Sequence, residues 1–251
     1  MTIDGINVAI AAGGRIGGAF AAEVGTEVKA LAPIGASTIL ERTISAAAAL
    51  GARRIVVLGD AEVAARCDRR VERVLPDYGE GAANMLACLR AFRDDTAASA
   101  ILLLACDLPF LTAAALHRYL EAIPAEAVAL GICSGDEYET RFPGAPTNGV
   151  ILCRERIVNA GAFVVPLPAI DSVARESAAF FNARKYPWQM AMRAGFGILA
   201  AHAIGRLGVA QIERRAARVL GTTVAAIRGC PPELCFDVDS LDEYRYARAR
   251  T

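Results

Sequence analysis

The sequence has few lysines, few histidines and no excess of charge of either sign. Lys29 and Lys185 are the only lysines among 27 basic residues, and 27 acidic residues balance these to a net charge of zero. His117 and His202 are the only histidines. A neutral chain has no bulk attraction for nucleic acid, so we expect no nucleic-acid partner. The balance is compatible with a small ligand that carries local charge.

The cysteine spacing, the start of the sequence and the apolar runs argue against zinc-bound, disulfide-linked, secreted and membrane-spanning proteins. The seven cysteines contain no CxxC pair, which argues against a structural zinc site or a disulfide framework. No charged leader with an apolar run and a cleavage site opens the sequence. The most apolar stretch, 195–210, contains His202 and Arg206 and is too short to span a bilayer. We therefore expect a cytoplasmic protein with no membrane partner.

Apolar strands and amphipathic helices alternate through the first half of the chain. Runs typical of buried strands occur at Ile6–Ala12, Arg54–Gly59 and Ala100–Ala105, and the last of these is unbroken, as in a central parallel strand. Helical patterns follow each run, and one of them begins with a capping box at Thr38 and Glu41. This order predicts an α/β fold with a doubly wound sheet.

The second half of the chain has a different pattern. Residues 131–168 predict short strands and turns, and residues from about 167 to 221 predict a helical, arginine-rich insertion. Three large side chains of this insertion are expected in the core or in an interface, namely Tyr186, Trp188 and Met190. Because no linker divides the chain, we predict a single domain over residues 1–251.

Two polar features follow predicted strands in the first half. The glycine-rich loop Ala12–Gly18 can bring backbone N–H groups close to phosphate, because glycine has no Cβ atom. Asp107 directly follows the strand Ala100–Ala105, and Mg²⁺ is commonly held by one or two carboxylates together with substrate phosphates. Ligands of such sheets bind beyond the carboxyl ends of the strands, so we expect both features in one cleft.

A third feature lies near the end of the chain. A strand is predicted over Glu233–Asp239, which places Asp237 and Asp239 on the same side. Two such carboxylates are costly to bury unless a cation or hydrogen-bond donors neutralise them. The alternative is that Asp239 only favours the N-terminus of the helix that a capping box at Ser240 and Glu243 opens. Both interpretations remain open on the residues alone.

Together these motifs resemble the nucleotide-diphospho-sugar transferase fold and, within it, the MobA-like NTP transferases, which include the molybdenum cofactor guanylyltransferase. Four motifs occur in the family's order between residues 6 and about 248. They are Ala12-Gly13-Gly14, the element Lys29–Gly35 (KALAPIG), the acidic turn Leu104–Pro109 (LACDLP) and the closing segment Asp237–Tyr244 (DVDSLDEY). The resemblance implies a three-layer Rossmann-like sandwich with a mostly parallel, mixed sheet and a helical insertion near the C-terminus.

The resemblance also implies roles for individual residues. Asp107 would bind Mg²⁺, with Asp237 or Asp239 completing the coordination, and Lys29 would neutralise phosphate charge. The residues that would contact the nucleotide are Ala12, Gly13, Gly14, Gly79, Gly81 and Asn84. Relatives carry an arginine three or four residues after the second glycine of the loop, where this chain has Gly17 and Gly18. Arg15 is the candidate that replaces it.

The implied reaction transfers a nucleoside monophosphate from an NTP, with GTP or CTP favoured, to a phosphorylated small-molecule acceptor and releases pyrophosphate. An acceptor phosphate is already ionised, so the reaction needs positioning and charge neutralisation more than a general base. Mg²⁺ is the expected cofactor. The sequence leaves the base, the acceptor and the oligomeric state open, a homo-oligomer included.

Two other functions compete with this one. Residues 12–17 also fit the glycine pattern of an NAD(P)-binding Rossmann oxidoreductase. That fingerprint requires an acidic residue about 20 positions further on, and residues 30–35 contain none. An inactive relative that only binds nucleotide is the second competitor, and the altered arginine position is its support.

Overall fold

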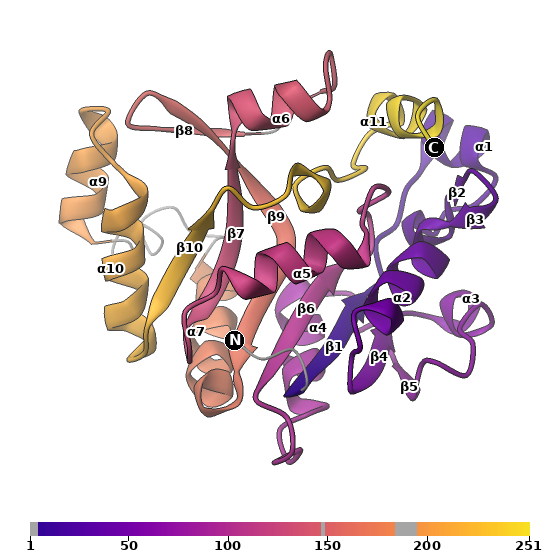
Figure 1. The fold of residues 1–251 in the computed structure, drawn as a ribbon, viewed down its shortest axis with the longest axis horizontal. Coiled ribbons are helices and arrows are strands. Elements are labelled where there is room, and N and C mark those ends of the chain that lie inside the picture. Colours follow the sequence, from indigo (N-terminus) through magenta and orange to yellow (C-terminus); the bar gives the residue numbers. More distant parts are fainter. Residues whose placement is uncertain (1–4, 147–148, 184–194) are drawn as a thin grey trace.

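The computed structural model describes residues 5–146, 149–183 and 195–251. Its central element is an eight-stranded sheet with the order β10-β7-β9-β6-β1-β4-β5, in which β8 pairs with β9 (Figure 1). The strands are β1 (Ile6–Ala11), β4 (Arg54–Leu58), β5 (Arg73–Leu75), β6 (Ala100–Ala105), β7 (Val128–Ser134), β8 (Val150–Leu152), β9 (Glu155–Pro166) and β10 (Val224–Arg228). β9 runs antiparallel to both β6 and β7, whereas the pairs that β1 forms with β4 and β6 are parallel. The predicted mixed, mostly parallel sheet is therefore confirmed.

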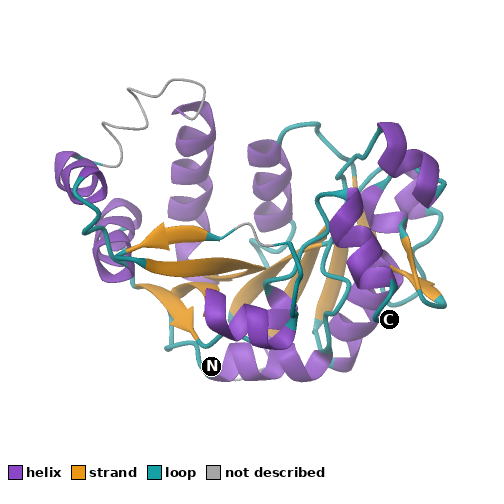
Figure 2. Cartoon of the chain, turned by 90° about the horizontal axis from the view of Figure 1, so that it is seen from above, coloured by secondary structure: helices purple, strands orange, loops and turns teal. Residues whose placement is uncertain are grey.

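Helices cover both faces of this sheet. Figures 1 and 2 show α2 and α5 on one face and α4 and α7 on the other, with the strands between the two layers. The helices are α1 (Gly18–Val24), α2 (Ile39–Ala49), α3 (Ala61–Ala64), α4 (Gly81–Arg90), α5 (Ala113–Glu121), α6 (Gly135–Arg141), α7 (Ile170–Ala183), α9 (Phe196–Ala203), α10 (Val209–Leu220) and α11 (Leu241–Arg248). This arrangement is the predicted three-layer α/β sandwich.

The buried strands divide the core into two layers. Val8 and Ile10 of β1 pack with α2 and α5, while Ala9 packs on the other face with α4 and α7. Successive side chains of a strand point to opposite faces, so a strand covered on both sides must be apolar throughout. This explains the unbroken apolar run of β6, which is almost fully buried next to β1.

The predicted capping boxes begin the helices as expected. The hydroxyl of Thr38 accepts from the backbone N–H of Glu41, and Ser240 and Glu243 form the same arrangement at α11. A third capping box, Ser134 with Glu137, opens α6, which we had not predicted. The expectation of only short strands and turns over 131–168 is wrong, because this region also contains α6 and the twelve-residue strand β9.

The strand predicted over Glu233–Asp239 is also wrong. A 3₁₀ helix occupies Pro232–Leu234, and the N–H of Cys235 donates to the carbonyl of Pro232. Pro231 and Pro232 have no N–H to donate to a sheet and their fixed φ favours a turn. The strand of this region comes earlier, at Val224–Arg228, where β10 pairs in parallel with β7.

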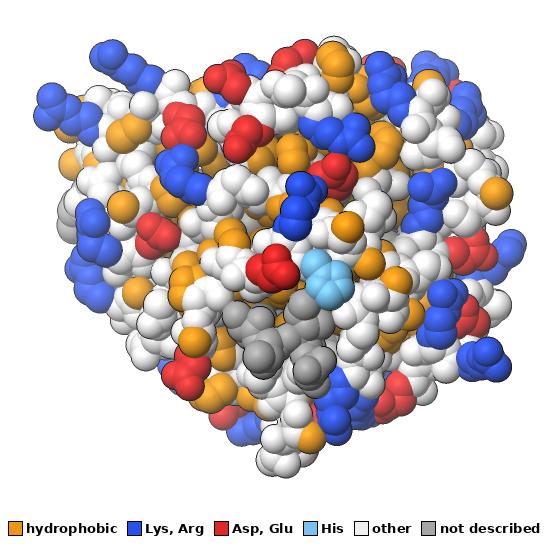
Figure 3. All heavy atoms as spheres, in the orientation of Figure 1, with side chains coloured by type: hydrophobic (Ala, Val, Ile, Leu, Met, Phe, Trp, Pro, Cys, Tyr) orange, Lys and Arg blue, Asp and Glu red, His pale blue; other side chains and the backbone are white. Residues whose placement is uncertain are grey.

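The described part of the predicted insertion is helical, as expected. It contains α7, α9 and α10, with a short 3₁₀ helix, η3 (Leu167–Ala169), before them. Tyr186, Trp188 and Met190 lie outside the described residues. Within the described residues, every helix is too short or too polar to cross a membrane. Figure 3 shows acidic and basic side chains interspersed over the described part of one face, in keeping with the zero net charge.

Candidate functional site

The glycine loop and the acidic turn lie side by side because two adjacent parallel strands end there. Ala11 at the end of β1 is in register with Ala105 at the end of β6. The N–H of Cys106 donates to the carbonyl of Ala11 at 3.1 Å, so the turn that carries Asp107 leaves the sheet beside the loop that carries Gly13. The structure therefore brings together the two features that we expected in one cleft.

Lys29 joins this pair from a separate segment. It begins the 3₁₀ helix η2 (Lys29–Leu31), and its backbone N–H donates to the carbonyl of Gly14 at 2.9 Å. Its Nζ donates to Oδ2 of Asp107 at 2.7 Å and to Oδ1 of Asp239 at 2.5 Å. Although burial alone would lower the pKa of Lys29, the charges and hydrogen bonds of these carboxylates raise it above its ordinary value. Lys29 is thus held as an ammonium.

The closing segment is tied directly to the acidic turn. The backbone N–H of Val238 donates to the carbonyl of Asp107 at 3.0 Å, which brings Asp237 and Asp239 to the same end of the sheet. Burial, and then the charges of Asp107 and Asp239, raise the pKa of Asp237 to about 6. Three carboxylates from two distant parts of the chain therefore interact here, although no strand holds the second part.

The free oxygens of these carboxylates suit a cation. Oδ1 of Asp107 is buried and has no hydrogen-bond partner among the residues that the structure describes. A buried carboxylate oxygen without a donor is costly, and oxygen ligands are those that Mg²⁺ and Mn²⁺ take from proteins. Within the described residues, however, no three acidic, histidine or cysteine side chains surround one common metal position. The ammonium of Lys29 lies between two of the carboxylates instead.

A second loop closes against the glycines. The carboxylate of Asp77 accepts from the N–H of Gly79 at 2.8 Å and from the side-chain amide of Asn84 at 2.8 Å. The amide oxygen of Asn84 in turn accepts from the N–H of Tyr78 at 2.9 Å. Gly79 has a φ of 72°, and Gly81 is the first residue of α4. Of the residues predicted to contact the nucleotide, Gly79 thus lies in the loop that Asp77 organises, and Gly81 and Asn84 lie in the first turn of α4 that follows it.

Sequence reasoning missed Asp77, although it organises this loop. A Cβ atom on Gly13 would lie 2.4 Å from Oδ2 of Asp77, so these two residues are in direct contact. The signal was present in the sequence: an Asp two residues before a Gly is typical of a turn in which the carboxylate accepts from the later N–H. Glu243 was assigned only a capping role, but its Oε2 also accepts from the N–H of Asp239 at 2.8 Å.

Lys29, Asp107 and Asp239 form an ion-pair cluster, called the Lys29 cluster below, and Arg15 lies outside it. Its guanidinium pairs with Asp60 and lies 3.9 Å from a carboxylate oxygen of Glu62, and half of its side chain is exposed. Its backbone pairs with that of Val28, next to Lys29. Arg15 therefore borders the glycine loop through its backbone, while its side chain is directed to the residues after β4.

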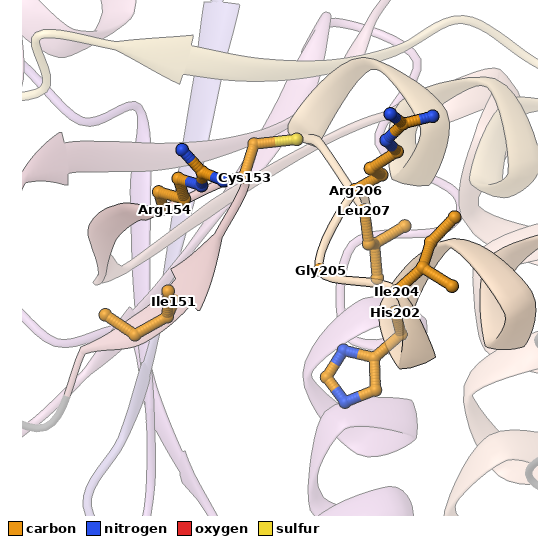
Figure 4. Close-up of a pocket in the computed structure, with 8 residues that line it drawn as sticks. All are labelled: Ile151, Cys153, Arg154, His202, Ile204, Gly205, Arg206 and Leu207. Atoms are coloured by element: carbon orange, nitrogen blue, oxygen red, sulfur yellow. The ribbon is translucent and has the colours of Figure 1, made fainter.

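A cavity of about 440 Å³ lies elsewhere on the molecule, and none of the predicted site residues lines it. Figure 4 shows Cys153 and Arg154, from the turn between β8 and β9, on one side of this cavity. His202 of α9 and Arg206 lie on the other side. The Lys29 cluster and this cavity are separate features.

Comparison with known proteins places the chain in a family. The sequence matches the MobA-like NTP transferase domain over residues 8–146, which is more than half of the chain and includes the glycine loop, Lys29 and Asp107. No functionally curated protein matches the sequence.

Solved structures are similar over nearly the whole chain. A hypothetical transferase from Thermus thermophilus has 25% identity and a TM-score of 0.80, with 95% of this chain and 99% of that one covered. The 4-diphosphocytidyl-2C-methyl-D-erythritol synthase of Anaerococcus prevotii has 10% identity and a TM-score of 0.61, with 99% of each chain covered. A Mycobacterium tuberculosis protein solved in complex with manganese has 18% identity and a TM-score of 0.53, with 99% and 100% covered. With its glycine loop, lysine element and acidic turn in the matched region, this chain belongs to the family of MobA-like NTP transferases.

Proposed function

We propose that the chain is a single-domain nucleotidyltransferase that transfers a nucleoside monophosphate from an NTP to a phosphorylated small molecule and releases pyrophosphate. The observation that carries the proposal is the cluster of Lys29 with Asp107 and Asp239 beside the glycine loop. GTP and CTP are the favoured donors. The fold shared with a diphosphocytidyl synthase supports CTP.

The residues around the cluster fit a divalent cation. Asp107, together with Asp237 or Asp239, would hold Mg²⁺, because the unpartnered Oδ1 of Asp107 and the raised pKa of Asp237 both mark uncompensated carboxylate oxygen. A cation bound there would offset the negative charge of the phosphate oxygens during transfer. The manganese complex of a protein with the same fold supports a divalent cation as the cofactor.

The chain's own groups position the reactants. Backbone N–H groups at Gly13 and Gly14 would cradle the phosphates, because a glycine has no Cβ atom. The N–H of Ala12 donates to the carbonyl of Leu58 at 2.8 Å, so Ala12 would border the nucleotide without donating this hydrogen bond to it. Lys29 would neutralise phosphate charge with its ammonium. The acceptor phosphate attacks the α-phosphorus and pyrophosphate leaves, so no general base is required. Gly79 and the first turn of α4, with Gly81 and Asn84, would border the base.

Asp107→Asn tests the proposal. We expect pyrophosphate release from the preferred NTP to fall by about a hundredfold or more, as when a main electrostatic stabiliser is lost. Asp94→Asn is the matched control, because Asp94 is an exposed aspartate in the loop before β6, at the opposite end of that strand. A panel of four NTPs with phosphorylated acceptors would identify the donor. Near-normal turnover by the Asp107 variant would refute the assignment.

The competing functions give different outcomes. The oxidoreductase alternative needs residues 30–35 at the end of a strand next to β1, but the strand next to β1 on that side is β4. Pro33–Ile34 (β2) pair instead with Ser37–Thr38 (β3) in a separate two-stranded sheet. NTP binding without pyrophosphate release, on the other hand, would favour the inactive relative.

A further inference from the structure

We propose that Lys29 and the divalent cation compete for the carboxylates of Asp107 and Asp239, so that cation binding releases the lysine ammonium toward the NTP. This inference rests on the proposed function and concerns the order of events at that site. It assigns Lys29 two positions: one on the carboxylates before the cation binds and one on phosphate afterwards.

The contacts of Lys29 define the first position. Its Nζ donates to Oδ2 of Asp107 at 2.7 Å and to Oδ1 of Asp239 at 2.5 Å, which are hydrogen-bond distances to two of the three proposed cation ligands. The side chains of Lys29 and Asp107 are only 14% and 16% exposed, so this ion pair is largely shielded from water. A divalent cation bound by these two carboxylates, including the unpartnered Oδ1 of Asp107, would lie close to the ammonium on Oδ2, where two positive charges repel strongly. We therefore expect the cation and the ammonium to disfavour each other at these carboxylates.

The backbone around the carboxylates is anchored, so Lys29 is the member that can move. The carbonyl of Asp107 accepts from the N–H of Val238, and the N–H of Asp239 donates to Glu243. The backbone of Lys29 is held by the carbonyl of Gly14, whereas its ammonium is held by the two carboxylates for which the cation competes. Its four-carbon side chain is flexible, and a lysine can change its rotamer without any change in the fold.

Gly14 indicates where the ammonium goes. A Cβ atom on Gly14 would lie 3.1 Å from Cε of Lys29, so the aliphatic part of the lysine runs directly over this glycine. A small rotation moves Nζ from the carboxylates along the glycine loop, which is the proposed phosphate cradle. The exchange thus replaces one ammonium by a cation of higher charge and delivers the ammonium to the incoming phosphates.

The low lysine content makes the displacement directly observable. The chain contains only two lysines, so ¹⁵N-lysine labelling gives two side-chain signals, and the one missing from Lys29→Arg belongs to Lys29. We expect Mg²⁺ alone, added without NTP, to shift the ¹⁵N NMR signal of the Lys29 side chain in the wild-type protein. Calorimetry on the same sample measures how much Mg²⁺ is bound. Saturation of the site with an unchanged Lys29 signal would overturn the inference.

Cation affinity provides the second measurement. Lys29→Met should tighten Mn²⁺ binding to the NTP-free protein by about tenfold or more, since the competing charge-assisted hydrogen bonds are gone. Lys185→Met, which removes the only other lysine, should bind Mn²⁺ as the wild type does. Unchanged or weaker Mn²⁺ binding by Lys29→Met would contradict competition.

Asp107→Asn separates this inference from the proposed function. If that variant loses both Mn²⁺ binding and pyrophosphate release while Lys29→Met shows no tightening, only the competition is wrong. If Asp107→Asn retains wild-type Mn²⁺ affinity and turnover, the cation site itself is wrong, and the competition falls with it.

Discussion

Gly13 has no room for a side chain, because a Cβ atom there would lie 2.4 Å from Oδ2 and 2.7 Å from Cγ of Asp77. Gly13→Ala must therefore displace the Asp77 carboxylate and the loop that it organises. We expect a loss of roughly 1–3 kcal/mol in the free energy of unfolding, as for other overpacked sites, and a raised KM for NTP. Thermal unfolding and steady-state kinetics measure the two effects.

Gly17→Ala is the control for this steric argument. No atom lies within 4 Å of a Cβ at Gly17, whose φ of −146° suits any residue. Gly17 is the N-cap of α1 and alanine is a poorer N-cap than glycine, so this variant should cost up to about 1 kcal/mol and leave the KM for NTP unchanged. In the Gly13→Ala, Asp77→Ala double variant the overlap is removed, so the two changes should be non-additive. Additive effects would mean that the contact does not cause the loss.

The pH dependence of stability should contain a contribution from the titration of Asp237. Its pKa is raised from 3.8 to about 6 in the folded protein, first by burial and then by Asp107 and Asp239. Between these two values the folded state binds more protons than the unfolded state, so the free energy of unfolding falls as the pH rises through this window. Urea unfolding with a chelator present should show that Asp237→Asn loses this contribution. An identical pH slope in both proteins would contradict it.

At the scale of the element, Glu243 in the first turn of α11 anchors the backbone of Asp239, a proposed cation ligand. Glu243 is buried, and its Oε2 accepts from the N–H groups of Asp239 and Ser240 at 2.8 and 2.7 Å. Glu243→Ala leaves these donors without their partner and should lower the free energy of unfolding by roughly 1–3 kcal/mol. It should also weaken Mn²⁺ binding, because Asp239 loses its anchor.

The capping box of α6 offers a matched control for this prediction. Glu137 accepts from the N–H of Ser134 at 2.7 Å in the same arrangement, but α6 carries none of the proposed cation ligands. Glu137→Ala should lower stability and leave Mn²⁺ affinity unchanged. Equal Mn²⁺ affinity in the two variants would show that the cap of α11 does not position Asp239.

Local signals predicted most elements, and their failures have physical causes. The strands β1, β4 and β6 and the helices α2, α5 and α11 were predictable because apolar periodicity and caps lie within each segment. The strand expected over Glu233–Asp239 failed because Pro231 and Pro232 favour a turn over the apolar alternation. α6 was missed although Ser134 and Glu137 have capping-box spacing, and β9 was expected as shorter pieces because its pairing with β6 and β7 is not encoded locally.

At the scale of the whole molecule, the C-terminal helix α11 is hydrogen-bonded to the segment Lys29–Gly35, called the lysine segment below. The hydroxyl of Tyr244 donates to the carbonyl of Pro33 at 2.9 Å, and its ring lies 5.7 Å from that of Phe20. Tyr244→Phe keeps the packing but leaves the carbonyl without this donor, which should cost about 1 kcal/mol of stability. Because Pro33 follows Lys29 closely, we also expect a higher KM for NTP.

Tyr246→Phe is the control on the same helix. Its hydroxyl donates to the carbonyl of Pro143 at 3.1 Å, away from the lysine segment. This variant should leave the KM for NTP unchanged. A similar rise in KM for both variants would mean that the effect comes from α11 in general.

The candidate site was predictable only in part, because some of its contacts join segments that are far apart in the sequence. Family resemblance selected Lys29, Asp107 and the aspartates of the closing segment, and the structure brings Lys29, Asp107 and Asp239 into contact. The ion pair of Arg15 with Asp60 and the contact of Gly13 with Asp77 were not predictable. They depend on how loops after different strands meet, which no local spacing specifies.

The antiparallel strand β9 divides the otherwise parallel sheet into two parts. Since β9 runs against both β6 and β7, it enters the sheet at the rim where its neighbours leave it. On one side of β9 lie β6 and β1, which precede the acidic turn and the glycine loop, and on the other side lie β7 and β10. Connections at the far side can change in length without altering the register of β1 and β6. We therefore expect chain-length differences among related proteins to fall on the β7 and β10 side, while the proposed nucleotide site beside β1 and β6 keeps its geometry.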